Sequence, residues 1–432
     1  MQRRRIPTVF ALFCLLSALL SANFGVAQNP GQGLSDRMIV GYQGWFGCPK
    51  DFDDNKYWQH WFVKGVAPEN FTVDLLPSVR DIDPKDLCLT QLHRPDGSPI
   101  YLYSAQNANV VLTHFRWMKD HGIDGAAVQR FIGPIADPVK RERSDNVLRN
   151  AMAAAEKQGR VFYICYDISG AEAATVIRDV RADWQHLVND LKLTASRSYL
   201  VDHGKPVLEL WGFGFSDRPG NADEVGQLIN DLKAGRQGLA AATLVGGVPT
   251  NWRTLTADSK SDPAWAGVFR SYDVISPWSV GRFANDEGAD AFYRDHLQPD
   301  VVETRRLGIR YMAVIFPGFS WSNLMRNRGQ QGALNATPRR CGNFLWHQVV
   351  NALDARVNAL YGAMFDEVDE GTAMFPTETR ADKLPDKAKL VFLNEDGCSL
   401  PDDWYLRVLG KAADHMRHHS KPARELTAEL RP

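Results

Sequence analysis

One kind of junction recurs along the chain and restricts the folds that it can adopt. A segment with one apolar helical face ends at a glycine, and a β-branched or aromatic run follows directly, as at Gly122, Gly159 and Gly308. Glycine is the usual residue just beyond a helix, because it adopts the left-handed conformation without strain. Each junction therefore predicts a helix that leads into a strand.

Eight apolar runs alternate with helical segments and fit buried strands. They are Met38–Phe46, Ile123–Phe131, Val161–Ile168, Pro206–Trp211, Ala242–Val248, Asp273–Trp278, Tyr311–Phe316 and Ala359–Phe365. Strand–helix alternation predicts an α/β protein with a parallel sheet, and eight units favour closure into a (β/α)8 TIM barrel. No Gly-x-Gly-x-x-Gly motif follows the first run, which disfavours a dinucleotide-binding sheet.

Residues 1–27 have the pattern of a secretory signal peptide. Three arginines precede the apolar stretch 9–20, and small residues lead up to Ala27. The stretch is too short to span a bilayer, and no later run approaches the roughly 18 apolar residues of a spanning helix. A lipid anchor at Cys14 is disfavoured by the bulky Phe13 before it, and twin-arginine export fits less well than ordinary secretion. We expect a secreted or periplasmic protein without a membrane partner.

The remaining chain suits one barrel domain, residues 28–418, with a polar tail, 419–432, that we expect to fray. The polar segment Asp51–Pro99 is a long loop after the first strand and is expected to form a lid or a substrate subsite. Its 50 basic and 51 acidic residues give the chain a net charge of −1, which disfavours nucleic acid as a partner. We expect a monomer with a neutral partner.

Five cysteines remain after removal of the signal peptide. Cys165 lies inside an apolar run and is predicted to be a buried free thiol. An oxidising compartment favours disulfides among the other four, and the pairings Cys48–Cys88 and Cys341–Cys398 would hold neighbouring loops together. Four cysteines allow three connectivities, so the other two remain open.

Aromatic and polar residues follow the predicted strands at their carboxyl ends, where barrel enzymes carry their chemistry. The residues expected to contact substrate are Tyr42, Trp45, Gln129, Arg130, Tyr166, Trp211, Trp278 and Phe319 near the strand ends, His60 and Trp61 in the long loop, and Asp369. Each aromatic residue taken singly is as easily explained by core packing. Their concentration on one rim favours a sugar-binding cleft, because flat rings pack against sugar rings.

The sharpest feature is a run of acids after the eighth strand, which includes Asp366, Glu367, Asp369 and Glu370. Glycoside hydrolysis needs one protonated and one ionised carboxyl group. Two glutamates three residues apart at a strand end can reach one cleft, and crowded acids raise one another's pKa values. Glu367 and Glu370 are therefore the predicted catalytic pair, with a solvated acidic loop as the alternative.

The run Glu367–Thr372 resembles the Glu-x-x-Glu-Gly-Thr motif of glycoside hydrolase family 99, the endo-α-mannosidase and endo-mannanase family. Phe316–Phe319 resembles its Pro-Gly-Tyr stretch, and Gly41–Phe46 with His60–Trp61 resembles its opening strand and loop. The order is kept across roughly Met38–Phe375, and the related family 71/99-like secreted proteins are also similar. The resemblance implies a (β/α)8 barrel.

The resemblance also implies a mechanism without a covalent glycosyl-enzyme. Glu367 takes the proton of the sugar's 2-hydroxyl, that oxygen attacks the anomeric carbon, and Glu370 protonates the leaving oxygen. This route requires a 1,2-trans glycoside, such as an α-mannoside. Two departures from the family put mannose specificity in question: Val368-Asp369 replaces Trp-His, and Phe319 replaces the tyrosine.

We therefore predict a secreted retaining glycoside hydrolase that acts on a 1,2-trans-linked polysaccharide or glycan. The alternatives are a non-catalytic glycan-binding barrel protein and an endo-α-1,3-glucanase resembling family 71, although the 2-hydroxyl route does not suit the latter. The start of a calcium loop at Asp51-x-Asp53-x-Asn55 lacks its glycine and its glutamate. No zinc-protease or serine-hydrolase motif occurs, so we expect neither a metal nor another cofactor.

Overall fold

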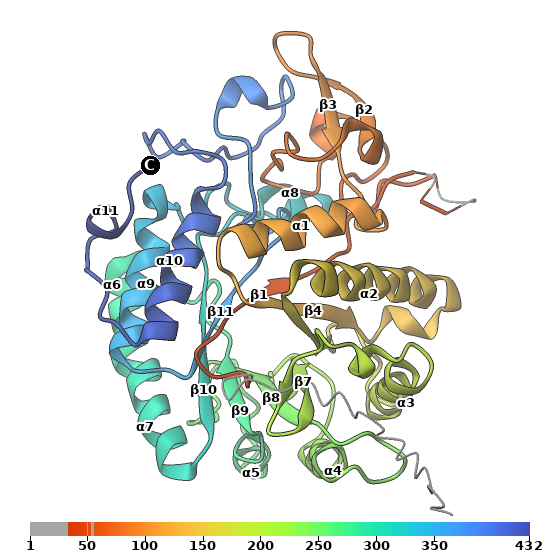
Figure 1. Cartoon of the computed structure of the whole chain (residues 1–432), viewed down its shortest axis with the longest axis vertical. Helices are drawn as coiled ribbons and strands as arrows, with labels where there is room; N and C mark the ends of the chain where they lie inside the picture. Colours follow the sequence, from red (N-terminus) through yellow and green to blue (C-terminus); the bar gives the residue numbers. More distant parts are fainter. Residues whose placement is uncertain (1–32, 50, 53–55) are drawn as a thin grey trace, which may run out of the picture. The chain divides into compact units, whose positions relative to one another are not determined.

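The computed structural model describes residues 33–49, 51–52 and 56–432. The predicted signal peptide and part of the calcium-like motif lie outside these residues. Parallel strands close into a barrel, with helices around its outside (Figure 1). Around the barrel the strands are β1 (Met38–Tyr42), β4 (Gly125–Phe131), β5 (Val161–Asp167), β7 (Lys205–Trp211), β8 (Thr243–Val248), β9 (Val274–Pro277), β10 (Arg310–Ile315) and β11 (Ala359–Gly362).

Each of the eight predicted runs overlaps one barrel strand, and only β7 and β10 begin one residue earlier than predicted, so the predicted (β/α)8 fold is confirmed. The barrel closes where the first strand of the chain pairs with the last, with Met38 opposite Leu360 and Val40 opposite Gly362. A pairing of β5 with β7 completes the ring on the other side. Because these two strands are parallel, the residues after β1 and the residues after β11 meet at one seam, where Gln43 contacts Asp366.

Helices cover the outer face of the barrel and follow the strands in sequence. They are α1 (Ala108–Asp120), α2 (Pro138–Gln158), α3 (Val176–Asn189), α4 (Ala222–Ala234), α5 (Trp265–Phe269), α6 (Asp286–Phe292), α7 (Gln298–Leu307), α8 (Ser322–Asn327), α9 (Asn343–Asp354), α10 (Trp404–His418) and α11 (Leu426–Glu429). The predicted glycine stops are confirmed, since Gly159 and Gly308 have φ of 62° and 71° directly after α2 and α7.

The long loop after β1 is folded and contains a small antiparallel hairpin of β2 (Cys88–His93) and β3 (Pro99–Leu102). Figure 1 shows this hairpin beyond one end of the barrel. Residues Trp61 and Phe71 in this loop are fully buried. The loop also pairs with the chain after β11, through a bridge between Leu75 and Val391. It is therefore a packed layer, and the sequence alone underestimated its apolar content.

Two disulfides hold these outer segments, Cys48–Cys88 and Cys341–Cys398, as the sequence predicted, and Cys165 is buried and free. The second short antiparallel pair is β6 (Val201–Asp202) with the start of β7. The tail after α10 does not fray as expected. Leu426 is buried against the core, and the indole nitrogen of Trp346 donates to the carbonyl of Ala423.

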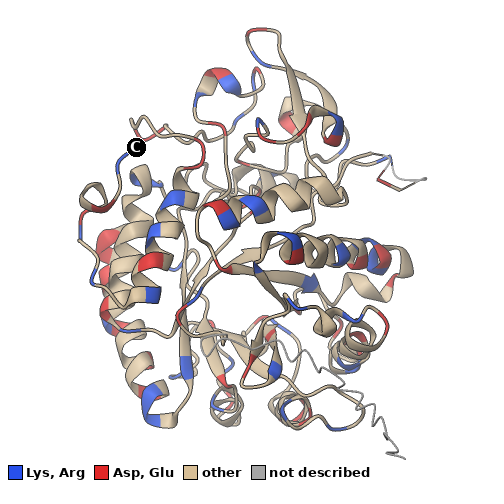
Figure 2. Ribbon diagram, in the orientation of Figure 1, with Lys and Arg blue, Asp and Glu red and all other residues tan. Residues whose placement is uncertain are grey.

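Basic and acidic residues are interspersed along the outer helices, in keeping with the balanced composition (Figure 2). Among the described residues, no helix is both long enough and apolar enough to cross a membrane.

Candidate functional site

The acidic run after β11 begins with Asp366, whose side chain joins the chain after β11 to the chain after β1. Its carboxylate is fully buried and accepts hydrogen bonds from the backbone nitrogens of Gln43 (2.7 Å) and Gly44 (2.9 Å), just after β1. Burial raises the pKa of Asp366 to about 7, while the two backbone donors oppose that shift. Asp366 therefore fixes the residues that follow β1 against the acidic run.

Glu367 lies next in the run and is held by two side-chain donors. Its Oε1 accepts from Nε2 of Gln43 at 3.1 Å, and its Oε2 accepts from Oγ1 of Thr372 at 3.2 Å. Thr372 also closes the turn, because its backbone nitrogen donates to the carbonyl of Glu367. The side chain of Glu367 is thus fixed in one orientation, which general-base catalysis requires.

Glu370 is placed by the turn and by the loop after β10. Its carbonyl accepts from the backbone nitrogen of Ser320 at 2.9 Å. Gly371 has a φ of 63°, and a Cβ there would meet the Ser320 backbone nitrogen at 2.9 Å, so this position requires glycine. The Gly-Thr end of the sequence motif therefore has a structural reason, because it returns Glu370 toward Glu367.

The electrostatics of the two glutamates are coupled. Burial raises the pKa of Glu367 well above its ordinary value, and the charge of Glu370 raises it further. Burial and the charge of Asp369 raise the pKa of Glu370 to about 7, against the opposing charge of Arg328. Such a pair retains one shared proton near neutral pH. The hydrogen bonds from Gln43 and Thr372 stabilise the ionised form of Glu367 and oppose this rise in its pKa.

Asp369 and the long loop meet beside this pair. Oδ2 of Asp369 lies 3.8 Å from Nδ1 of His60, while its Oδ1 is buried without a hydrogen-bond partner. His60 stacks on Trp45 with ring centroids 4.4 Å apart, and Trp45 stacks on Phe131 at 5.3 Å. The predicted residues His60, Trp45 and Asp369 are therefore together at the acidic run.

Other predicted aromatic residues occupy the carboxyl-end rim of the barrel at other strands. Trp211, at the end of β7, contacts Trp278, which follows β9, with ring centroids 5.4 Å apart. Phe319 follows β10 and contacts Trp321 at 5.2 Å. Gln129, near the end of β4, is 8% exposed. These four residues are on the expected rim, and their part in substrate binding stays a prediction.

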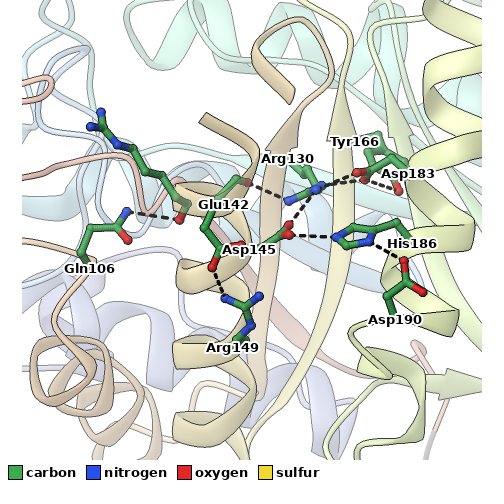
Figure 3. Close-up of polar contacts among 11 residues, drawn as sticks. Gln106, Arg130, Glu142, Asp145, Arg149, Tyr166, Asp183, His186 and Asp190 are labelled. Atoms are coloured by element: carbon green, nitrogen blue, oxygen red, sulfur yellow. Dashed lines mark hydrogen bonds and ion pairs between the residues drawn. The ribbon is translucent and has the colours of Figure 1, made fainter. Parts of the chain in front are cut away.

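Arg130 and Tyr166 do not face the rim, and their expected contact with substrate is corrected by their positions. Arg130 donates from Nε and Nη2 to the Asp183 carboxylate at 2.6 Å each, and it pairs with Asp145 at 2.9 Å. The Tyr166 hydroxyl also donates to Asp183 (Figure 3). Successive side chains of a strand point to opposite faces, so Arg130 points outward toward α2 and α3.

Tyr42 and Trp61 are likewise buried, and their polar atoms pair with groups other than the acidic run. The Tyr42 hydroxyl hydrogen-bonds Nδ1 of His114, on α1, at 3.0 Å. Trp61 packs on Phe46, and its indole nitrogen donates to the Tyr103 carbonyl. Both side chains are fully buried, so they support the site from behind and are not sugar platforms.

Three supporting residues were not among the predicted substrate contacts, although two of them, Gln43 and Asp167, stand at the ends of predicted strands. Gln43 follows β1 directly, and its inward position relative to Tyr42 was the available signal. Asp167 ends β5, and burial raises its pKa to about 6. Asp74 accepts hydrogen bonds from Ser320 Oγ and from the backbone nitrogens of Ser322 and Asn323 at the start of α8, which ties the long loop to the segment that holds Glu370. No sequence pattern marked Asp74.

Among the described residues, no group of three or more histidine, cysteine, aspartate or glutamate side chains is placed to hold a metal ion.

Comparison with known proteins gives a fold relationship at low sequence identity. No protein-family profile matches the chain, and no curated protein matches it. The family 99 endo-α-mannosidase of Bacteroides thetaiotaomicron is similar in structure, with a TM-score of 0.63, 15% identity, and coverage of 89% of this chain and 99% of that chain. Its complex with Bis-Tris-propane gives a TM-score of 0.61 at 14% identity, covering 89% and 98%.

The chain therefore has the (β/α)8-barrel fold that is found in these glycoside hydrolases. More narrowly, it shares the fold of family 99 endo-α-mannosidases over nearly the whole of their length, as the Glu-x-x-Glu-Gly-Thr resemblance implied.

Proposed function

We propose that this protein is a retaining glycoside hydrolase that cleaves a 1,2-trans-linked glycan, with an α-mannoside as the first candidate. The observation that carries the proposal is the buried pair Glu367 and Glu370, whose pKa values are both raised. Burial keeps one proton on the pair near neutral pH, and the donors to Glu367 separate the two roles. The shared fold with family 99 endo-α-mannosidases supports the proposal.

The proposed reaction has two steps at the same carbon. Glu367 accepts the proton of the 2-hydroxyl, the resulting oxygen displaces the aglycone at the anomeric carbon, and Glu370 gives its proton to the departing oxygen. In the second step Glu370 takes a proton from water, which opens the 1,2-anhydro ring, and Glu367 returns its proton to the 2-oxygen. Two inversions give net retention of configuration.

Conservative substitutions of the two acids test the assignment. We expect Glu367→Gln and Glu370→Gln each to lower kcat by at least about a hundredfold, because each removes acid–base assistance. The melting temperature should barely change, since glutamine preserves the shape. Glu224→Gln, at an exposed glutamate on α4, is the matched control and should keep full activity.

The assay is release of reducing ends from α-mannans, α-glucans and arabinoxylans, with product sizes resolved. Near-full activity in either glutamine variant would refute the pair. Binding of a glycan by the unmodified protein without any hydrolysis would instead favour a non-catalytic glycan-binding protein.

We also propose that the protein is exported, on the signal-peptide pattern of residues 1–27. Amino-terminal sequencing of the protein recovered outside the cytoplasm should begin at Gln28, and recovery of an unprocessed chain from the cytoplasm alone would contradict export.

A further inference from the structure

A cavity of about 370 Å³ opens beside the acidic run, between the ends of β1 and β4 and the first turns of α2. Its volume is in the range of small-molecule binding sites. Gln43 lines this cavity and also donates to Glu367, and His60 lines it and also faces Asp369. A group bound in the cavity would therefore be next to the proposed catalytic pair.

The walls of the cavity carry polar atoms that the protein does not satisfy. Oε1 of Gln43, Oε1 of Gln129 and Nε1 of Trp45 are buried and lack a hydrogen-bond partner. The side chains of Gln43 and Gln129 are each only 8% exposed. Buried polar atoms are nearly always paired in folded proteins, so these three atoms, which have almost no exposed surface, need a small side-chain rotation and a partner in the cavity to be satisfied. Two acceptors and one donor suit the hydroxyls of a sugar.

The charged side chains of the cavity are basic. Apart from His60, the ionisable lining residues are Lys140 and Arg143, on the first two turns of α2. Nε of Arg143 is buried without a hydrogen-bond partner, and its guanidinium lies 4.9 Å from the centre of the Phe52 ring. Among the described residues, neither cation forms an ion pair.

Asp51, which interacts electrostatically with Arg143, forms its hydrogen bonds with other groups. The carboxylate of Asp51 accepts from the backbone nitrogen of Cys48 and from Oγ of Ser104, and it is only electrostatically coupled to Arg143. The cations on α2 are therefore available to a bound anion. Guanidinium groups bind planar carboxylates and sulfates particularly well.

We propose that this cavity binds a sugar unit that carries an acidic group, a carboxylate or a sulfate ester. The hydroxyls of the sugar pair with Gln43, Gln129 and Trp45, and the acidic group pairs with Arg143 and Lys140. As a statement about substrate, this inference rests on the proposed hydrolase function, and it narrows the substrate class to an acidic glycan. The binding itself does not depend on turnover.

Calorimetric titration of the unmodified protein with monosaccharides tests the binding alone, because monosaccharides contain no glycosidic bond. The probes are glucuronate and mannose 6-sulfate, each compared with its neutral parent, glucose and mannose. We expect the acidic sugars to bind at least about tenfold more tightly than the neutral ones, with an affinity that falls as salt is added. The stronger of the two acidic probes identifies the acidic group.

Substitutions separate the charged and neutral contacts. Arg143→Gln and Lys140→Gln should each weaken binding of the acidic sugars by about tenfold, with little effect on the neutral sugars. Gln129→Leu should weaken both kinds of sugar. Arg141→Gln is the matched control, because Arg141 lies on the same helix, is exposed and does not line the cavity.

Equal affinity for acidic and neutral sugars, or no binding of either acidic probe at millimolar concentrations, would overturn the proposal. Its failure is distinguishable from failure of the proposed function. If Glu367→Gln abolishes hydrolysis but sugar binding does not depend on Arg143, the proposed hydrolase function is supported and the proposed acidic-sugar site is refuted. If acidic sugars bind in a way that depends on Arg143 but no glycan is hydrolysed, the acidic-sugar site is supported and the hydrolase function is refuted.

Discussion

A single carboxylate, Asp369, adjusts the proton affinity of the proposed catalytic acid. Its negative charge raises the pKa of Glu370, which adds to the effect of burial and keeps the proton on Glu370 up to about pH 7. Glu370 must donate that proton, so kcat/KM should fall as the pH rises above about 7.

Removing the charge of Asp369 should move this alkaline limb. In Asp369→Asn the pKa of Glu370 drops, so activity should begin to fall at a lower pH than in the unmodified protein. The measurement is kcat/KM across the pH range on one substrate. Asp369→His should change the pH profile or the substrate preference more than it reduces kcat. An unchanged alkaline limb in both variants would mean that Asp369 has no influence on the acid.

The residues at the strand ends show which parts of the site the sequence could predict. Glu367 and Glu370 follow an apolar run with a motif, so their place was predictable. The pairing of Gln43 with Glu367 was not, because it joins residues 324 positions apart and depends on barrel closure. Tyr42 was assigned to the cleft because it ends a strand, but the alternation of strand side chains turns it toward His114.

At the level of elements, a buried ionic cluster joins β4 to the helices outside it. Arg130 on β4 pairs with Asp145 on α2 and Asp183 on α3, and His186 bridges Asp145 and Asp190 (Figure 3). The carboxylates of Asp145 and Asp183 are almost fully buried. Breaking such a cluster on one side leaves uncompensated buried charge.

Arg130→Met should therefore destabilise the protein by about 3–5 kcal/mol, measured by urea denaturation. It should leave KM unchanged below the melting temperature, because Arg130 points away from the acidic run. Arg141→Met, at an exposed position on α2 that does not line the cavity, is the control for stability. A rise in KM with unchanged stability would contradict this structural role and would support the substrate contact that the sequence predicted for Arg130.

The barrel strands and helices were predicted more accurately than the way the segments outside the barrel pack on them. The eight strands and the helix stops follow from apolar runs and glycines, which are local signals. The hairpin of β2 and β3 and the buried Phe71 were missed because the long loop looks polar overall, and its apolar residues are too dispersed to form a periodic pattern.

Taken as a whole, the barrel encloses an acid that its proposed chemistry does not use. Glu209, on β7, is buried inside the fold, and its Oε2 accepts from the hydroxyl of Tyr163 at 3.0 Å. Burial raises the pKa of Glu209 to about 7. The folded protein therefore binds this proton more tightly than the unfolded chain, in which glutamate has a pKa of about 4.3.

The sign of the effect on stability follows from that difference. The contribution of Glu209 to stability is largest below about pH 4 and declines as the pH rises toward 7, because the unfolded chain then releases a proton that the folded protein retains. Glu209→Gln should raise stability relative to the unmodified protein at pH 8, and by less at pH 5. Urea denaturation at the two pH values measures this, with Glu224→Gln as the exposed control. A difference that does not depend on pH would contradict the assigned ionisation.

The seam between β1 and β11 has a consequence for how the molecule becomes active during synthesis. Gln43 leaves the ribosome near the start of the chain, whereas Glu367, which it orients, emerges more than three hundred residues later. No nascent fragment that lacks β11 can hold both groups together, so the proposed catalysis requires that β11 has paired with β1. The rate at which turnover recovers during refolding should therefore report the rate at which β1 and β11 pair.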